Sequence, residues 1–389
     1  MTHTTEGRHL SLLPLYACAF GITVSNSMIF PALSDLQDKY GFSAAGLGFI
    51  AASGFLASLL VQLFLAPYAD RGHPKRLVML GLILAAVGAL LFAFGTSLPV
   101  FIVGRSFAGA SLGSSGPAIR AIVANMDKAR AAERLGRLRG IELSGFTGGP
   151  LIGALLIGPL GLRGAFLLFG SIAVITLVAV STQQLPALPS TAESRRNSFG
   201  LLRIRQVRAA ALASMTLFLP VGIYDALWDR YITDRGGNNF QVGLTFLLYT
   251  IPFMLLAPRS GRMADRRGPA LVAVVGIFLM APLVWVYGLL STPELLVGFA
   301  IVEGIIGSMN SPSVQSWMAR VAPHGRASAA QGLMSSADLL AATMMSLLAP
   351  ALYGAYGPAF TFGFAAVLMV VFGTVVALMI RGTDIPPAT

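Results

Sequence analysis

The sequence predicts an all-α membrane protein with twelve transmembrane helices in two related six-helix bundles. Three observations lead to this prediction: an apolar composition, a one-sided distribution of basic residues and an internal repeat. Of the 389 residues, 55% are hydrophobic and only 11% are charged, and the mean hydropathy is +0.75. A soluble protein of this size needs more polar surface. A lipid bilayer is therefore the predicted solvent for most of the chain.

Long apolar segments recur along the chain, each close to the ~20 residues that a helix needs to cross the hydrocarbon. Because a helix satisfies its backbone hydrogen bonds internally, each segment is predicted to be helical. The first is interpreted as a retained helix, since no small-residue cleavage pattern follows it. The predicted spans are residues 10–30, 44–67, 77–95, 98–122, 136–160, 163–182, 207–229, 241–258, 269–290, 294–317, 328–352 and 358–380.

The basic residues lie almost entirely on one side of the predicted membrane. If successive loops alternate between the two sides, 22 of the 27 Lys and Arg residues share the side of both termini, and four lie opposite. This is the positive-inside pattern, which predicts cytoplasmic termini. Topology thus accounts for the net charge of +11, and we expect no nucleic-acid partner.

Several kinds of chemistry find no support in the sequence. There is no G-x-x-x-x-G-K-[ST] phosphate loop, so ATP is not the expected energy source. Cys18 is the only cysteine, which excludes an intramolecular disulfide. No Cys/His cluster indicates a metal site. We expect no metal, no cofactor and no enzymatic activity.

An internal repeat relates the two halves. Asp70-Arg71 and Asp265-Arg266 are 195 residues apart and on the same predicted side of the membrane. A shift of 195 or 196 residues also relates Gly109 to Gly304, Gly116-Pro117 to Ser311-Pro312, Gly136 to Gly332 and Glu142 to Asp338. Agreement in both loops and helices predicts two parallel six-helix halves related by an axis along the membrane normal.

The repeat also predicts the domain organisation. Residues 1–182 form the N-terminal bundle, residues 183–206 a cytoplasmic linker rich in Pro, Ser and Arg, and residues 207–389 the C-terminal bundle. Two bundles joined in this way can rock about a site at their interface, which is how alternating access is built.

The chain resembles the transporters of the major facilitator superfamily over essentially its whole length. Residues 66–75, centred on Asp70 and Arg71, resemble the family's loop signature G-x-L-a-D-R-x-G-R-K, and residues 261–268, with Asp265 and Arg266, are a closer copy. The resemblance implies the major facilitator fold, with the first, fourth, seventh and tenth helices lining a central cavity.

The two signatures indicate a conformational latch. A carboxylate at a helix end can bind an arginine of a neighbouring helix while that side of the protein is shut. We expect Asp70 and Arg120 to latch the outward-open state. Asp265 is expected to hold a weaker latch, because Gln315 stands at the position equivalent to Arg120. The alternative is that the signatures only set topology.

The fifth predicted helix carries the most specific functional signal. Gly145, Gly149 and Gly153 recur every four residues and form a smooth groove, and Pro150 bends the helix. Ordinary close helix packing would explain these residues too. They resemble, however, the G-x-x-x-G-P-x-x-G-G signature of proton-coupled drug exporters, with Ala154 in the last glycine's place. The resemblance implies export by antiport, with this helix at the interface between the halves.

Charged residues inside the predicted spans are candidates for proton coupling, because each is costly in lipid without a partner, water or a proton. Arg105 lies in a segment that resembles the family's R-x-x-Q-G signature. Among the acids, Glu303 is the first candidate for the proton carrier, with Arg105 tuning it, and Asp225 and Asp338 follow. Glu142 is the weakest, because Arg139 can neutralise it locally.

Other residues of these spans are candidates for contact with a substrate, although hydrogen bonds between helices or contact with lipid would explain them equally well. These candidates are Asn26, Tyr224, Trp228, Tyr249, Phe253 and Asn310. Together with a carboxylate, such aromatic residues would suit a lipophilic molecule, often a cationic one.

The sequence therefore predicts a monomeric bacterial inner-membrane transporter that uses the proton gradient to export a small lipophilic or amphiphilic compound, as in multidrug efflux. Two alternatives stay open. One is an exporter of metabolites or sugar derivatives, or a proton symporter, of the same fold. The other is a membrane protein that senses or handles lipids without pumping.

Overall fold

The computed structural model describes residues 12–69, 73–126, 130–183, 198–323 and 326–381. Within these ranges all regular structure is helical, which confirms the predicted fold class. The elements are α1 (Leu13–Ser27), η1 (Phe30–Ala32), α2 (Leu33–Tyr40), α3 (Ala44–Ala69), α4 (Pro74–Phe94), α5 (Leu98–Met126), α6 (Ala131–Thr182), η4 (Ser198–Arg203), α7 (Arg205–Thr233), α8 (Asn239–Arg267), α9 (Pro269–Tyr287), α10 (Pro293–Val321) and α11 (Ala327–Ile380).

The helices of the described residues account for twelve membrane crossings. Nine are long and apolar enough to be candidate spans, and those built on α6 and α11 have 50 and 52 residues. Each of these two contains a glycine with positive φ, Gly161 at 66° and Gly357 at 77°, where the chain turns back. Each thus crosses twice, and α5, with 29 residues, supplies the remaining span.

The repeat seen in the sequence is a repeat of structure. Ala44 and Asn239, Pro74 and Pro269, and Leu98 and Pro293, which begin equivalent helices, are each 195 residues apart. The long helices α6 and α11 begin 196 residues apart, and so do their turning glycines. From α3 and α8 onward, the two halves therefore have equivalent helices in the same order. The predicted domain boundaries stay a prediction, since most of the linker lies outside the described residues.

Equivalent glycines let equivalent helices approach closely. In the N-terminal half, a Cβ on Gly109 of α5 would overlap the carbonyl group of Gly54 of α3. In the C-terminal half, a Cβ on Gly304 of α10 would overlap the carbonyl group of Tyr249 of α8. Small residues at such crossings are the usual means of packing helices in lipid. The repeated glycines are therefore packing positions of the fold.

The two halves meet through two equivalent helix pairs, α3 with α11 and α6 with α8. At the first, a Cβ on Gly48 would lie 2.6 Å from the carbonyl oxygen of Ser346. At the second, a Cβ on Gly243 would lie 2.5 Å from the Cα of Leu151. The interface is thus built on close backbone contact.

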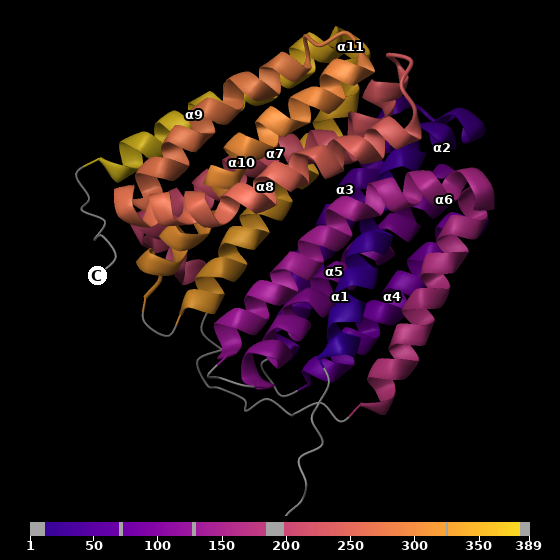
Figure 1. Ribbon diagram of the computed structural model, residues 1–389, viewed down its shortest axis with the longest axis horizontal. Helices are drawn as coiled ribbons and strands as arrows, with labels where there is room; N and C mark the ends of the chain where they lie inside the picture. The colour runs from indigo at the N-terminus through magenta and orange to yellow at the C-terminus, as the bar shows by residue number, and fades with distance from the viewer. Residues whose placement is uncertain (1–11, 70–72, 127–129, 184–197, 324–325, 382–389) are drawn as a thin grey trace, which may run out of the picture.

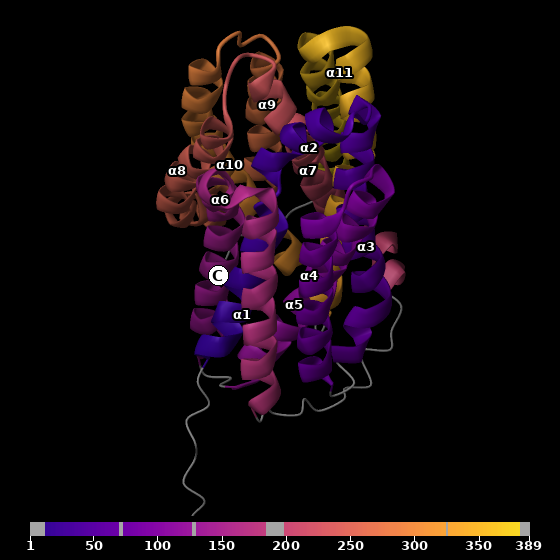
Figure 2. The same cartoon turned by 90° about the vertical axis from the view of Figure 1, so that its right-hand side faces the viewer.

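The bundles lie together at one end of the molecule and diverge toward the other (Figure 1). The first end carries α2 and the turn from α7 to α8, and we call it the closed end. The opposite end carries the start of α4 and the end of α5, and we call it the open end. Figure 2 shows α2 beside α7, between the two bundles.

The first span differs from the prediction, which ended it at residue 30. The helical path breaks after Ser27, passes through η1 and continues in α2 to Tyr40. Pro31, inside η1, has no backbone N–H to donate and so interrupts the helical hydrogen bonds. Because α2 is polar, with Asp35 and Lys39 among its residues, hydropathy did not predict it.

Candidate functional site

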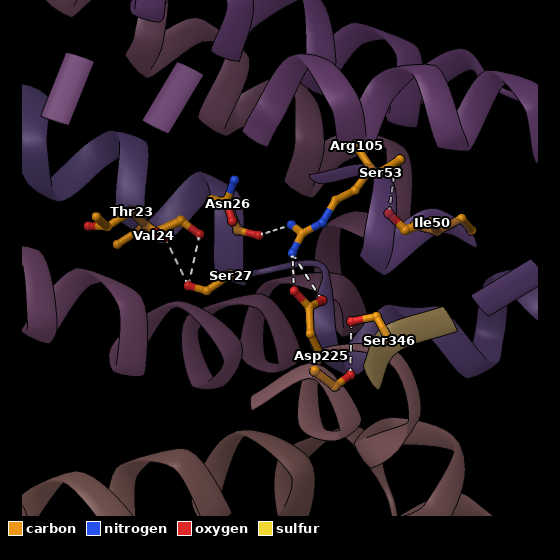
Figure 3. Close-up of polar contacts among 10 residues, drawn as sticks. Thr23, Val24, Asn26, Ser27, Ile50, Ser53, Arg105, Asp225 and Ser346 are labelled. Atoms are coloured by element: carbon orange, nitrogen blue, oxygen red, sulfur yellow. Dashed lines mark hydrogen bonds and ion pairs between the residues drawn. The ribbon is translucent and has the colours of Figure 1, made fainter. Parts of the chain in front are cut away.

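A buried ion pair joins the two halves. Nη2 of Arg105, on α5, donates to both carboxylate oxygens of Asp225, on α7, at 3.0 and 2.7 Å. Nη1 of Arg105 donates to the carbonyl oxygen of Asn26, so the guanidinium lies between α1 and α7 (Figure 3). Gly54 leaves room for it, because a Cβ there would lie 2.9 Å from Nε of Arg105.

Burial makes this pair mutually dependent. Arg105 is 3% exposed and Asp225 is 4% exposed. A lone charge at this depth would be costly, and the contact of Nη2 with both carboxylate oxygens offsets that cost for both partners. The pair therefore stabilises the arrangement in which the Arg105 side chain reaches from α5 to α7.

Glu303 has a different environment. This α10 carboxyl is 6% exposed and accepts hydrogen bonds from the hydroxyl groups of Tyr224 at 2.7 Å and Tyr287 at 2.8 Å. Trp228 packs against both tyrosine rings, with centroid distances of 5.1 and 5.0 Å. Within the described part of the chain, no cationic group lies within ion-pair distance of Glu303.

The expectation that Arg105 tunes Glu303 directly is wrong, because the ion-pair partner of Arg105 is Asp225. The physical reason is geometric: Glu303 faces tyrosines of its own half, on α7 and α9, whereas Arg105 reaches across from α5. The repeat places Glu303 at the equivalent of Ala108, a position within one half. It carried no information about contacts between halves.

Asp338 and Glu142, which the repeat relates, have unequal partners. Glu142 accepts from Arg120 at 3.0 Å and from Arg139 at 3.2 Å, so the local neutralisation by Arg139 is present together with a second arginine. Asp338 is buried on α11, and its Oδ1 has no hydrogen-bond partner among the described residues.

The predicted latch residues are only partly described. Asp70 and Arg71 lie outside the described residues, and Arg120 pairs with Glu142. Gln315 stands at the position equivalent to Arg120, but Asp265 has another arginine partner, since Arg320 donates to it at 2.6 Å. This partner stands further along α10 than the position that the repeat suggested, and Ser316 also donates, at 3.1 Å.

Arg266, the other residue of that signature, is exposed near the end of α8. Both partners of Asp265 belong to its own half, so in this structure the second signature joins α8 to α10 and not one half to the other.

The glycine groove of the fifth span packs against α1. Cβ atoms on Gly145 and Gly149 would overlap Thr23 and Ser27 of α1, and one on Gly153 would overlap Met28, which directly follows α1. The groove itself therefore faces α1 inside the N-terminal half, on a helix that also lies at the interface between the halves, as the resemblance implied. The interface contact of this helix is made beside the groove, where Pro150 and Leu151 meet Gly243 of α8.

The substrate-contact candidates do not form one group. Tyr224 and Trp228 lie with Glu303, as described above, and Asn26 lies with Arg105. Tyr249 and Phe253 stack on one another along α8, with centroids 5.8 Å apart. Asn310 is buried against Gly276 of α9, and neither of its amide atoms has a hydrogen-bond partner in the described ranges.

One buried acid was not predicted as a site residue. Asp229, on α7, is 2% exposed and accepts the backbone N–H of Ser34 at 2.6 Å. Residues 34 and 229 are 195 apart, so the repeat relates them and they meet across its axis. The available signal was the position of Asp229 as a carboxylate at the end of the predicted span 207–229.

Across the described residues, no group of three His, Cys, Asp or Glu side chains could hold a metal ion. The chemistry available at these positions is proton binding at carboxyl groups and the making and breaking of ion pairs between the halves.

Comparisons with known proteins agree with this architecture. The family model of the Major Facilitator Superfamily matches residues 15–227 and 209–389. The multidrug resistance protein MdtG of Rahnella sp. (strain Y9602) is 24% identical over 317 residues, which cover 79% of this chain and 73% of the relative. MdtG of Klebsiella pneumoniae (strain 342) is 25% identical over 319 residues, with the same coverage.

Two crystal structures show the same fold. A bacterial homologue of the human lysosomal transporter Spinster, in an inward-facing and occupied conformation, superimposes with a TM-score of 0.79 at 13% identity, covering 96% of both chains. The nucleoside transporter NupG superimposes with a TM-score of 0.75 at 13% identity, covering 95% of this chain and 99% of the other. With both halves matched by the family model, this chain belongs to the major facilitator superfamily and is a membrane transporter.

Proposed function

We propose that this transporter is a proton-coupled antiporter that exports small lipophilic or amphiphilic compounds across a bacterial inner membrane. The names of its relatives, multidrug resistance proteins, support efflux as the direction of transport. The glycine and proline residues of the fifth span support antiport. The working unit is a single chain, with the proton gradient as the energy source and no cofactor.

The environment of Glu303 is the observation that carries this proposal. Its carboxyl group is enclosed by two tyrosines and has no counter-ion among the described residues. An acid in that position is costly as a bare charge, and a proton or a cationic substrate would remove the cost. Mutually exclusive binding of the two at one carboxyl group is what exchange transport requires.

The proposed orientation assigns the open end to the cytoplasm. Both termini and most Lys and Arg residues then face the cytoplasm, in keeping with the positive-inside pattern. The closed end faces the outside, with the Arg105–Asp225 pair among its contacts, and the structure corresponds to an inward-facing state. The outward-facing state forms when the two bundles separate at the closed end and come together at the open end.

The driving force is sufficient for efflux. Each proton that crosses the membrane potential releases about 2.3 kcal/mol per 100 mV, which corresponds to a nearly 50-fold gradient of a neutral compound. One or two protons can therefore sustain accumulation ratios of tens to thousands.

The first test is a flux measurement on inside-out vesicles, with a fluorescent lipophilic cation as the probe and the pH gradient imposed by acidification of the lumen. The Glu303→Gln variant is expected to lose probe transport driven by the gradient, because an amide cannot bind a proton. Glu294→Gln is the matched control: it makes the same change on the same helix at an exposed position.

Full transport by Glu303→Gln would remove that residue from the mechanism. Transport by the wild type that does not change when the gradient is collapsed would contradict proton coupling itself, and would favour a protein that does not pump.

A further inference from the structure

The short helix α2 carries most of the polar contacts between the halves. Apart from the Arg105–Asp225 pair, every polar contact that joins the halves in the described residues ends on α2. These are Ser34 N to Asp229 at 2.6 Å, Ser34 Oγ to Thr233 Oγ1 at 3.3 Å, Asn239 to Asp35 at 2.8 Å and Arg230 to Asp38 at 2.6 Å. This helix therefore fastens the closed end.

The start of α2 is capped from the other half. Its N-cap residue, Ala32, has no side-chain oxygen to accept the free N–H groups of the first turn. Asp229 supplies that oxygen from α7, through Oδ2 to the N–H of Ser34. A negative charge at this point is also favoured by the helix dipole. Leu33 and Leu36 of α2 pack in the core of the N-terminal half, so α2 belongs to that half and loss of the cap would weaken its hold on α7.

The charged and titratable groups around Asp229 are engaged with other partners. Its own Oδ1 has no partner among the described residues. The neighbouring groups are Asp225 bound to Arg105, Arg230 bound to Asp38 and Asp234, Asp35 bound to Asn239, Lys39 over the ring of Tyr40, Arg235 over the ring of Tyr231, and Tyr353 bound to Asp234. No cation among the described residues pairs with Asp229, so its charge is held mainly by the start of α2.

We propose that Asp229 is a proton-sensitive positioning residue: ionised, it caps α2 and holds the closed end shut, and protonated, it releases α2 and lets that end open. This deepens the proposed proton-coupled exchange and rests on it. Protonation removes the negative charge and with it the charge-assisted hydrogen bond and the attraction to the helix N-terminus. Protons arriving from the outer phase would thus favour the outward-facing state.

The test measures the distance between spin labels at the closed end. The labels are placed at Lys39→Cys on α2 and Ser291→Cys in the turn before α10, both exposed positions, after Cys18→Ser removes the native thiol. The distances are measured by double electron–electron resonance on the full chain in lipid nanodiscs at pH 8 and pH 5. The wild type is expected to raise its ratio of long to short distances about fivefold at pH 5, the size of effect that loss of one helix cap gives.

Two substitutions test the charge of Asp229. Asp229→Asn is neutral at both pH values, like the protonated acid, so its long distances should be populated at both. Asp229→Ala loses the cap, so its long distances should be populated at both. Ser34→Ala is the matched control, because it removes the contact with Thr233 and keeps the backbone N–H; it should follow the wild type.

Wild-type pH dependence that persists in Asp229→Asn would overturn the proposal, and so would an Asp229→Ala variant that stays closed at pH 8. If Asp229→Ala does not elute as a monodisperse protein, Asp229→Asn alone decides. The distance measurement does not depend on transport. Its failure can therefore be distinguished from a failure of the Glu303 experiment, which measures transport.

Discussion

Arg105 and Asp225 are two charges that the fold buries together, each with the other as its counter-ion. Removal of one leaves the other buried and unpaired, whereas removal of both leaves no charge to neutralise. Glu303 and Asp229 differ, because hydroxyl or backbone N–H groups contact them and no arginine of the described part of the chain does. Buried acids that pair with an arginine are thus expected to stabilise the fold and the closed end. Buried acids without an arginine are expected to bind protons.

This distinction gives a stability prediction for the ion pair. Asp225→Asn leaves an unpaired Arg105 and is expected to lower the free energy of unfolding by about 3–5 kcal/mol, the cost typical of breaking a buried pair. The double variant Arg105→Gln/Asp225→Asn removes both charges and should recover most of the loss. Thermal unfolding in detergent, followed by tryptophan fluorescence, measures the difference. A double variant that is less stable than the single one would contradict the mutual dependence of the two charges.

The glycines of α6 connect local sequence to helix packing. Gly149 faces α1, where an added Cβ would overlap the side chain of Ser27, whereas a Cβ on the neighbouring Gly148 would make only an ordinary contact, 3.9 Å from the side chain of Ile152. Gly149→Ala is expected to cost about 1–3 kcal/mol of stability through overpacking, while Gly148→Ala should be close to neutral. The same thermal unfolding assay compares them. Equal stability of the two variants would show that the groove tolerates side chains and that its glycines serve another purpose.

At the level of elements, much of the fold could be predicted from the sequence. Hydropathy identifies each span because nearly all of its residues contact lipid or protein and are therefore apolar. The repeat then indicates which helices of the two halves are equivalent. The break at Pro31 and the helix α2 were missed because this segment is polar and is stabilised by the other half. Contacts of this kind leave no periodic pattern in either segment.

The candidate site was less predictable for the same reason. Buried acids such as Glu303 and Asp225 could be found from their position in apolar spans, but their partners could not. Periodicity and the repeat describe one half at a time, whereas Arg105, Asp225 and Asp229 make contacts across the halves. Asp265 shows the limit on a smaller scale, since its arginine stands further along α10 than its repeat-equivalent position.

On the scale of the whole molecule, alternating access requires that contacts at one end exclude contacts at the other. The described polar contacts between halves lie at the closed end, on α2 and at the Arg105–Asp225 pair. At the open end, Arg120 is bound within its own half by Glu142. We expect the outward-facing state to exchange that partner for Asp70 of the loop signature.

This exchange predicts opposite effects for two neutralised acids. Asp70→Asn removes the partner of the outward-facing state, so it should favour the inward-facing state and lower transport without lowering expression. Glu142→Gln frees Arg120 and should favour the outward-facing state. Spin labels across the open end report the populations, and vesicle flux reports the consequence. Because one arginine serves both states in this scheme, shifts in the same direction, or no shift in either variant, would mean that Asp70 and Glu142 do not compete for Arg120. The loop signature would then act only through topology.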